Sequence, residues 1–147
     1  MKALLQRVSS AKVTVEQKVV GEIADGLLVF IGISSQDCQN DIDYIVDKTV
    51  NLRIFPDENG KFDRSLVDIR GSLLLVSQFT LYGDTKKGRR PSFTDAMPPE
   101  PARVLFDDLV DSFTRTGLCV EKGVFQADME VSLVNSGPVT IMLDSVL

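Results

Sequence analysis

The sequence predicts an α+β fold: a mainly antiparallel sheet, curled or closed into a partial barrel, with two packed helices. Alternating apolar and polar residues occur near both ends of the chain, which is typical of strands. Residues 38–52 and 98–117 instead repeat apolar residues at helical spacing. No internal repeat or low-complexity linker divides the 147 residues, so we expect one domain over residues 1–147.

The N-terminal part predicts four strands. Residues 2–8, 12–16 and 19–23 have the composition and alternation of short consecutive strands. Residues 26–33 are apolar throughout, as in a strand buried on both faces. This run is far shorter than the roughly 20 residues of a membrane-spanning helix. The start of the chain becomes polar too early for a secretory signal, so we expect a cytoplasmic protein that does not contact a membrane.

Residues 38–52 predict the first helix, with Ile42 and Ile45 on its apolar face and Asp37 or Asn40 as the cap of its first turn. A turn around Asn59 and Gly60 follows, because both residues accept a positive φ at little cost. The acidic residues of this turn do not have the spacing of an EF-hand calcium loop. The turn therefore predicts no calcium site.

Residues 98–117 predict the second helix, which begins after two prolines and ends at Gly117. Its apolar stripe predicts core packing; the stripe consists of Ala102, Leu105, Phe106, Leu109 and Phe113. The last segment predicts two alternating strands. Gly137 and Pro138 are expected at or near the tip of the join between them, where the missing N–H of proline is tolerated.

The residue types that are absent restrict the chemistry. The chain has no histidine, which excludes Ser-His-Asp and Cys-His mechanisms and any imidazole base. Cys38 and Cys119 are isolated, whereas structural zinc needs four Cys or His ligands. We therefore expect neither a metal nor a cofactor. Hydrolysis by this chain has to use a carboxylate, a hydroxyl, main-chain groups or a group that the substrate brings.

Ser77, Gln78, Phe79 and Thr80 are the first candidate site, because polar side chains here end a continuous apolar run, 73–76. A buried strand that ends in polar groups must satisfy or use them, since an unpaired buried polar group costs about 1–3 kcal/mol. The alternative is a satisfied strand end that leads into a turn.

These residues and the segment 135–140, Asn-Ser-Gly-Pro-Val-Thr, resemble the signature motifs of the bacterial-type D-aminoacyl-tRNA deacylases, also called D-tyrosyl-tRNA deacylases. Further segments resemble the same family in the same order: 6–8, 26–29, 51–55, 87–93 and 127–129. The resemblance covers nearly the whole chain. It implies the same fold, a homodimer, and hydrolysis of the ester bond of D-aminoacyl-tRNA and of glycyl-tRNA(Ala).

The resemblance also implies roles for single residues. Gly137 and Pro138 are expected to be joined by a cis peptide bond and to reach into the partner subunit's site. There their carbonyl oxygens would hold the substrate's ammonium group and exclude L side chains, and the missing Cβ of glycine allows this close approach. Arg7 is expected to brace this pair. The remaining expected substrate-binding residues are Asn135, Met129 and Phe93.

Two catalytic roles are open for residues 77–80. Thr80 as a nucleophile needs an adjacent base, and the sequence offers no evident one. The main-chain N–H groups of Phe79 and Thr80 can instead form an oxyanion site, in which one donor contributes about 2.7–4 kcal/mol in the transition state. We favour the oxyanion site, with assistance from the terminal 2′-OH of the RNA as the resemblance implies.

Lys86, Lys87, Arg89 and Arg90 place four cations within five residues of a chain whose net charge is −5. Such a basic loop can dock a phosphate backbone locally, so we expect it to bind tRNA. A solvated surface turn is the alternative interpretation. Two rival functions remain: a non-catalytic nucleic-acid-binding module that uses residues 86–90, and a structural dimerisation domain.

Two positions depart from the family's usual pattern. Ser136 stands where an acidic residue is usual, and Gln126 stands where a small residue is usual. We expect Gln126 to be peripheral to the site. The two departures therefore concern substrate preference and leave the predicted reaction unchanged.

Overall fold

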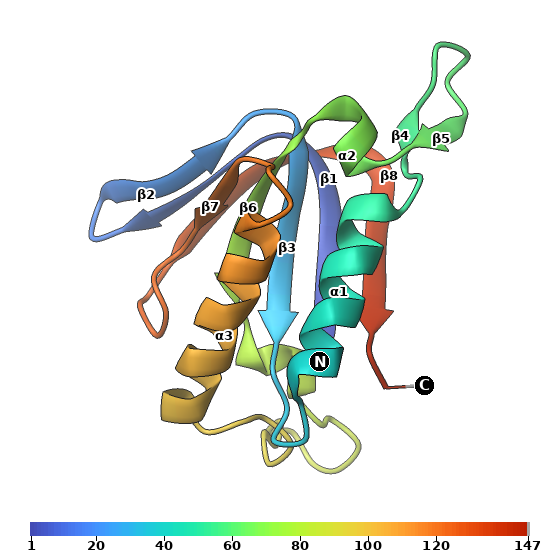
Figure 1. Cartoon of the computed structure of the whole chain (residues 1–147). Helices are drawn as coiled ribbons and strands as arrows, with labels where there is room; N and C mark the ends of the chain where they lie inside the picture. The colour runs from blue at the N-terminus through green and yellow to red at the C-terminus, as the bar shows by residue number, and fades with distance from the viewer. Residues whose placement is uncertain (147) are drawn as a thin grey trace.

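β1 (Lys2–Val15) is the central strand of a six-stranded sheet in the computed structural model, which describes residues 1–146 (Figure 1). One edge of β1 pairs antiparallel with β8 (Glu130–Asp144) over almost its whole length. The other edge pairs antiparallel with β3 (Gly26–Gly32) and then with β2 (Lys18–Ile23). The predicted strands 2–8 and 12–16 are therefore two parts of one long strand.

Beyond β3 the sheet continues through two parallel pairs. β6 (Ser72–Ser77) lies beside β3, and β7 (Val120–Lys122) lies beside β6. Most residues of β3 and β6 are buried, as their continuous apolar runs predict. The predicted α+β class with a mainly antiparallel, curled sheet is confirmed, and the parallel pairs are an addition to it.

The two predicted helices are α1 (Gln39–Asn51) and α3 (Pro99–Thr114), which lie side by side on one face of the sheet (Figure 1). A third helix, α2 (Leu66–Ile69), is a single turn that the sequence pattern did not indicate. Among residues 1–146, no helix is both long enough and apolar enough to cross a membrane.

The start of α1 differs from its prediction. The helix begins after Cys38, whose N–H donates to the Asp41 carboxylate (2.8 Å). Asp37, a predicted cap, instead accepts a hydrogen bond from the Met1 ammonium group (2.6 Å) and one from the Ser34 N–H (2.7 Å). The carboxylate of Asp37 is therefore occupied by a contact between distant parts of the chain, which no local pattern could reveal.

The larger of two apolar cores lies between the sheet and the helices. Leu5, Leu75 and Phe113 are fully buried there, and Ile42 and Ile45 pack onto them from α1. Each such side chain contributes about 1.5–3 kcal/mol when it is fully buried. This core holds β6 in place, and with β6 the segment that follows it.

The smaller core lies on the opposite face of the sheet, where Val13, Ile23 and Leu74 meet. It is enclosed because the sheet curls and brings β2 against β7. A Cβ on Gly21 would lie 2.8 Å from the carbonyl oxygen of Lys122, so this approach requires glycine. The curl corresponds to the predicted partial barrel.

β4 (Phe55–Pro56) and β5 (Phe62–Arg64) form a small hairpin that projects from the body of the protein (Figure 1). Gly60 has a φ of 77° at its turn, which confirms the turn predicted there. Within residues 1–146, no three His, Cys, Asp or Glu side chains are grouped so that they could hold a metal ion.

β8 corrects the prediction of two C-terminal strands. It is one strand, because both of its halves pair with the same neighbour, β1. One residue of β1, Arg7, faces four residues of β8, which leave the regular ladder and are called here the 136–139 bulge. Gly137 and Pro138 therefore lie in a bulge within one strand and not at the tip of a join between two.

Candidate active site

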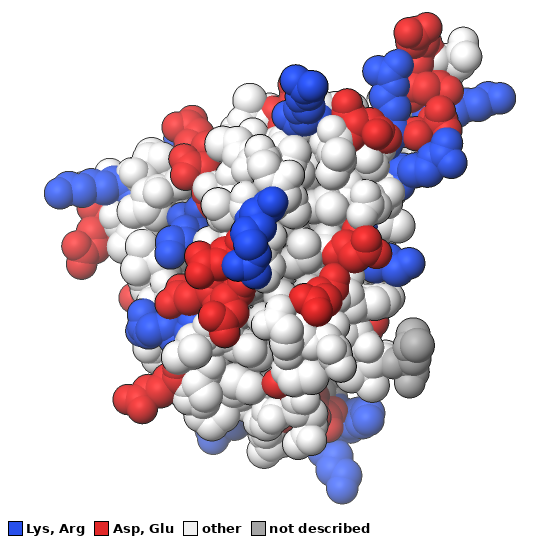
Figure 2. Space-filling model, viewed as in Figure 1, with Lys and Arg blue, Asp and Glu red and all other residues white. Residues whose placement is uncertain are grey.

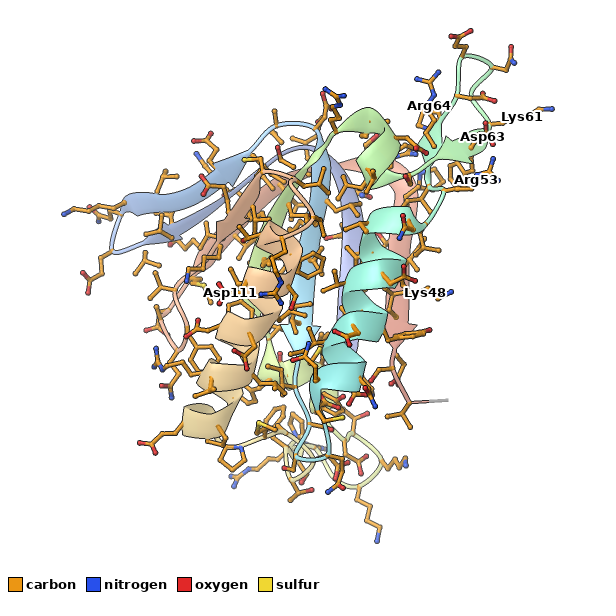
Figure 3. All side chains as sticks on the ribbon, viewed as in Figure 1. Lys48, Arg53, Lys61, Asp63, Arg64 and Asp111 are labelled. Atoms are coloured by element: carbon orange, nitrogen blue, oxygen red, sulfur yellow. The ribbon has the colours of Figure 1, made fainter. Side chains whose placement is uncertain are left out.

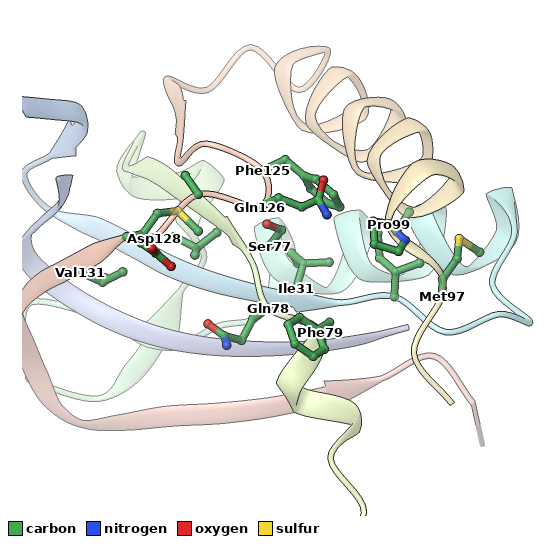
Figure 4. Close-up of a pocket in the computed structure, with 15 residues that line it drawn as sticks. Ile31, Ser77, Gln78, Phe79, Met97, Pro99, Phe125, Gln126, Asp128 and Val131 are labelled. Carbon is green, nitrogen blue, oxygen red and sulfur yellow. The ribbon is translucent and has the colours of Figure 1, made fainter. Parts of the chain in front are cut away.

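A cavity of about 500 Å³ opens where β6 ends, between this strand, the segment 125–131 and the start of α3 (Figure 4). Most of its wall is apolar. The polar side chains in its lining are Ser77, Gln78, Gln126 and Asp128. A concave, mostly apolar site with a few polar groups has the size and character of a small-molecule site.

The first predicted segment forms one side of this cavity. Ser77 is the last residue of β6 and pairs with Ile31 of β3, and the N–H of Gln78 donates to the carbonyl oxygen of Ile31 (2.7 Å). Ser77, Gln78 and Phe79 all line the cavity, whereas Thr80 does not. The end of the buried strand thus carries its polar side chains to the cavity wall.

Residues Phe79–Tyr82 form a 3-10 turn, η1, directly after β6. The first N–H groups of such a turn, those of Phe79 and Thr80, have no acceptor within the turn. The Thr80 hydroxyl accepts a hydrogen bond from Nε2 of Gln78. Within residues 1–146, no carboxylate or amine forms a hydrogen bond with this hydroxyl.

The opposite side of the cavity comes from the segment that precedes β8. Met129 lines the cavity there, as do Gln126 and Asp128. Gln126 has a positive φ of 63°, and its Oε1 accepts a hydrogen bond from Arg103 of α3 (3.0 Å). The expectation that Gln126 is peripheral is therefore wrong. Sequence reasoning also missed Asp128, whose only signal was its place in the matching segment 127–129.

Phe93 lies beside the cavity but is not part of its lining. Its ring meets that of Phe79 edge-on, with the ring centres 5.1 Å apart. Two main-chain hydrogen bonds between Asp84 and Ser92, of 2.8 and 2.9 Å, close the base of the loop that separates the two aromatic residues. The loop is therefore anchored next to the cavity wall.

This loop carries the four predicted cations, Lys86, Lys87, Arg89 and Arg90, and all four are exposed. None of them forms an ion pair with another residue of the range 1–146. In Figure 2, basic side chains project from the lower end of the molecule, where Figure 1 places the loop, while acidic and basic groups alternate over the helical face. The loop therefore has positive charge available for an anionic partner.

The second predicted segment is held by two side chains. Arg7 donates from Nε to the carbonyl oxygen of Ser136 (3.1 Å), and Nδ2 of Asn135 donates to the carbonyl oxygens of Arg7 (2.9 Å) and Val139 (3.2 Å). These contacts tie both ends of the 136–139 bulge to β1. The predicted cis peptide bond between Gly137 and Pro138 is confirmed.

The cavity and the bulge are separate within this chain. Ser77, Gln78, Phe79 and Met129 meet in the cavity. Arg7 and the segment 135–138 meet at β8, and none of these residues lines the cavity. Tertiary structure thus assembles the predicted site residues into two groups and does not join the groups in a single chain.

Comparison with known proteins identifies the family. A family model described as D-Tyr-tRNA(Tyr) deacylase matches residues 4–144. The chain belongs to this family. D-aminoacyl-tRNA deacylases of Thermosipho africanus and Syntrophomonas wolfei are 55% and 56% identical to it over 145 residues, which cover 99% of this chain and 97% of each relative. Membership confirms the predicted family and enzyme class, a deacylase and thus a hydrolase.

Two solved structures share the fold of this chain. A protein titled c-Myc DNA Unwinding Element Binding Protein superposes with a TM-score of 0.93 at 41% identity, over 99% of both chains. A probable eukaryotic D-amino acid tRNA deacylase superposes with a TM-score of 0.85 over 97% of both chains. That structure is only 18% identical to the present chain. The likeness therefore concerns the fold alone.

Proposed function

We propose that this chain hydrolyses the ester bond of D-aminoacyl-tRNA and releases the free D-amino acid and the tRNA, a chiral proofreading reaction of the cytoplasm. The observation that carries this proposal is the cavity of about 500 Å³ at the end of β6, lined by Ser77, Gln78 and Phe79, in a member of the D-Tyr-tRNA(Tyr) deacylase family. Residues 1–147 act as one deacylase domain in this proposal.

The main-chain N–H groups of Phe79 and Thr80 form the oxyanion site of the reaction. They begin a 3-10 turn, and so they remain free to donate to the carbonyl oxygen of the ester. One such donor contributes about 2.7–4 kcal/mol in the transition state. The family resemblance implies that the 2′-OH next to the ester on the terminal ribose supplies the further assistance, and the absence of histidine is consistent with this role.

The Thr80 side chain positions the site and does not attack the substrate. A hydroxyl nucleophile needs a group that takes its proton. The side chain that contacts the Thr80 hydroxyl is the Gln78 amide, which donates a hydrogen bond and cannot act as a base. This contact supports a role in holding Gln78 and the turn.

Gly137 and Pro138 exclude L-aminoacyl esters by means of their main chain, and their carbonyl oxygens hold the substrate's ammonium group. A Cβ built on Gly137 would have one heavy atom within 4 Å, Oδ1 of Asn135 at 3.6 Å, so the space beside this α-carbon is open in the protomer. The family resemblance implies that the bulge acts in the cavity of the partner subunit of a homodimer. The separation of the bulge from the chain's own cavity supports this arrangement.

A main-chain wall can block one direction of the α-substituent but cannot recognise a particular side chain. The same site therefore accepts different D-aminoacyl esters. It also accepts glycine, which has no side chain to exclude, so glycyl-tRNA(Ala) is a second substrate.

The basic loop binds the tRNA phosphates beside the cavity. The contact between Phe93 and Phe79 supports this role, because it anchors the loop to a residue of the cavity wall. The exposed cations Lys86, Lys87, Arg89 and Arg90 then lie close to the path by which the aminoacylated end enters.

A second candidate function is nucleic-acid binding without catalysis, through residues 86–90. The observation in its favour is the solved structure at 41% identity whose title names a DNA-unwinding-element-binding protein. Such a module would bind charged and uncharged tRNA alike and would leave the ester intact.

The decisive experiment incubates the purified protein with D-tyrosyl-tRNA and L-tyrosyl-tRNA in the presence of EDTA. We expect release of D-tyrosine and retention of the L ester. Binding of both RNAs without cleavage of either would favour the non-catalytic module. Cleavage of both at the same rate would contradict the proposed role of Gly137 and Pro138.

A further inference from the structure

The guanidinium group of Arg7 joins three segments that are far apart in the sequence. Nε donates to the carbonyl oxygen of Ser136 (3.1 Å), Nη1 donates to that of Ile54 (2.7 Å), and Cζ lies 5.6 Å from the centre of the Phe62 ring. Arg7 is only 8% exposed. Its charge therefore lies at the meeting point of β1, the 136–139 bulge and the hairpin.

This charge has no carboxylate partner. Among residues 1–146, no Asp or Glu forms an ion pair with Arg7. A buried charge has to be compensated, because burial removes its hydration. The available groups are two carbonyl oxygens and the face of one aromatic ring, a geometry that attracts a guanidinium. The ring of Phe62 is one of three groups that keep Arg7 in position.

Phe62 is itself in an unusual place for a large apolar side chain. It is 55% exposed, it lies on the projecting hairpin, and it belongs to neither apolar core. Core packing therefore does not account for an aromatic residue here. Its contact with Arg7 does.

The hairpin holds this ring at a defined position although it projects from the body. Arg53, just before the hairpin, donates from Nε to the carbonyl oxygen of Asp63 (2.9 Å) and pairs with its carboxylate (Figure 3). At the turn, Asp57 Oδ1 accepts hydrogen bonds from the N–H groups of Asn59 (2.8 Å) and Lys61 (2.9 Å). An exposed ion pair adds little stability, so we assign these contacts to the geometry of the hairpin.

We propose that Phe62 is a positioning residue of the deacylase, which acts through Arg7 to hold the 136–139 bulge where Gly137 and Pro138 reject L-aminoacyl esters. The inference rests on the proposed function of the bulge. Without the ring, the guanidinium group of Arg7 is open to water and can turn outward. The carbonyl oxygen of Ser136 then loses its donor, and the bulge loses its fixed position.

The loss should appear mainly in selectivity, because the wall of the cavity is built from other residues. The test compares Phe62→Ala, Phe62→Tyr and the wild-type dimer by kcat/KM on D-tyrosyl-tRNA and L-tyrosyl-tRNA. We expect Phe62→Ala to lower the ratio of D to L cleavage roughly tenfold, the size expected for a lost cation–π contact. D cleavage should fall by a smaller factor, because the displaced bulge also holds the substrate's ammonium group less well. Phe62→Tyr, which keeps the ring, should keep the ratio.

Two further variants make the test specific. Val19→Ala shortens another exposed apolar residue, 51% exposed on β2, and should leave the ratio unchanged. Arg53→Ala removes the tie between Arg53 and Asp63 without touching the ring, and should lower the ratio in the same direction as Phe62→Ala. Because Arg53 is exposed, this variant still tests the proposal if Phe62→Ala does not fold.

Two results would overturn the inference. One is a wild-type D to L ratio in both Phe62→Ala and Arg53→Ala. The other is dissociation of Phe62→Ala into monomers in sedimentation, since its effect would then come from the dimer contact. Arg7→Ala separates the two proposals. If Arg7→Ala keeps the wild-type D to L ratio, the proposed role of the bulge is contradicted. If Arg7→Ala lowers the ratio but Phe62→Ala does not, only the role of Phe62 is contradicted.

Discussion

The Nε of Arg7 donates to the carbonyl oxygen of Ser136 across the ladder between β1 and β8, at a distance of 3.1 Å. Asn135 completes the arrangement, because its amide donates to the carbonyl oxygen of Arg7 in β1 and to that of Val139, the last residue of the bulge. Gly137 therefore lies on main chain that is held at both ends and has open space beside its α-carbon. This combination suits a fixed wall that a substrate can approach closely.

Gly137→Ala should lower activity strongly and leave the fold intact. The new methyl group meets only Oδ1 of Asn135, at 3.6 Å, so we expect the free energy of unfolding to change by less than about 1 kcal/mol. In the proposed dimer the same methyl group would overlap with the substrate in the partner's cavity, and kcat/KM should fall by roughly a hundredfold or more. Thermal unfolding and the deacylation assay measure the two effects. The control is Ser136→Ala, which keeps the carbonyl oxygen that Arg7 holds. A fully active Gly137→Ala would rule out a close approach of Gly137 to the substrate.

Glycyl-tRNA should be a substrate, whereas L-alanyl-tRNA should be almost inert. The two esters differ by one methyl group, and a main-chain wall acts only on that group. Each 1.4 kcal/mol of steric overlap corresponds to about a tenfold difference in rate. Initial rates on the two esters check this expectation. Equal resistance of both would mean that the site recognises a D side chain directly.

Thr80→Ala should retain substantial activity. No base among residues 1–146 contacts the hydroxyl, and the main-chain N–H of residue 80 is unchanged by the substitution. A required nucleophile would instead lose nearly all activity. Single-turnover deacylation followed by mass spectrometry measures both the rate and any covalent product. Detection of an aminoacyl group on Thr80 in the wild-type protein would contradict the oxyanion mechanism.

Replacement of Lys86, Lys87, Arg89 and Arg90 by alanine should weaken tRNA binding and flatten its dependence on salt concentration. Each phosphate contact that is lost lowers the slope of log K against log salt by about 0.7–0.9. Stability should hardly change, because the four side chains are exposed and unpaired within residues 1–146.

A control for net charge replaces four exposed cations elsewhere, Lys12, Lys18, Lys48 and Arg115. This variant has the same charge as the loop variant but keeps residues 86–90. It should retain most of the wild-type affinity and salt slope. Equal losses of affinity and salt slope in both variants would mean that overall charge causes the effect. The loop would then be a solvated surface turn without a role in tRNA binding.

Tyr82 should make stability depend on pH in the alkaline range. Burial, and then the nearby Asp37 carboxylate, raise the pKa of Tyr82 above its ordinary value of 10.0. The stabilising contribution of the neutral phenol is complete below about pH 10 and is lost as the pH rises through the folded-state pKa. Above about pH 10, the free energy of unfolding measured in urea should therefore fall more steeply with pH for wild type than for Tyr82→Phe. Tyr44→Phe controls for the loss of a tyrosine hydroxyl, and equal slopes in wild type and Tyr82→Phe would contradict the expectation.

Much of the fold was predictable because it follows from local periodicity. The alternation of Val131, Leu133 and Leu143 marks the inward face of β8, and the spacing of Ile42 and Ile45 marks the buried face of α1. These patterns report which side of an element faces apolar surroundings, and that information is carried by neighbouring residues. The segments 77–80 and 135–140 were recognisable by their resemblance to the signature motifs of the family.

The pairing partner of each strand depended on contacts between distant residues. Both halves of β8 pair with β1. For this reason Gly137 and Pro138, where a turn was expected, lie in a bulge opposite Arg7. A turn and a bulge have similar local composition, so only the long-range ladder distinguishes them. The parallel pairing of β3 with β6 was hidden from the sequence in the same way.

The sequence by itself determined the classes of element, the absence of any imidazole chemistry and the two segments that match the motifs of the family. The tertiary structure decided which residues meet. It brought Gln126 and Asp128 to the cavity wall, and it put Phe62 over Arg7. The physical reason is that side-chain patterns record burial, whereas a cavity or a buried charge is defined by groups from several elements whose relative positions follow from packing of the whole chain.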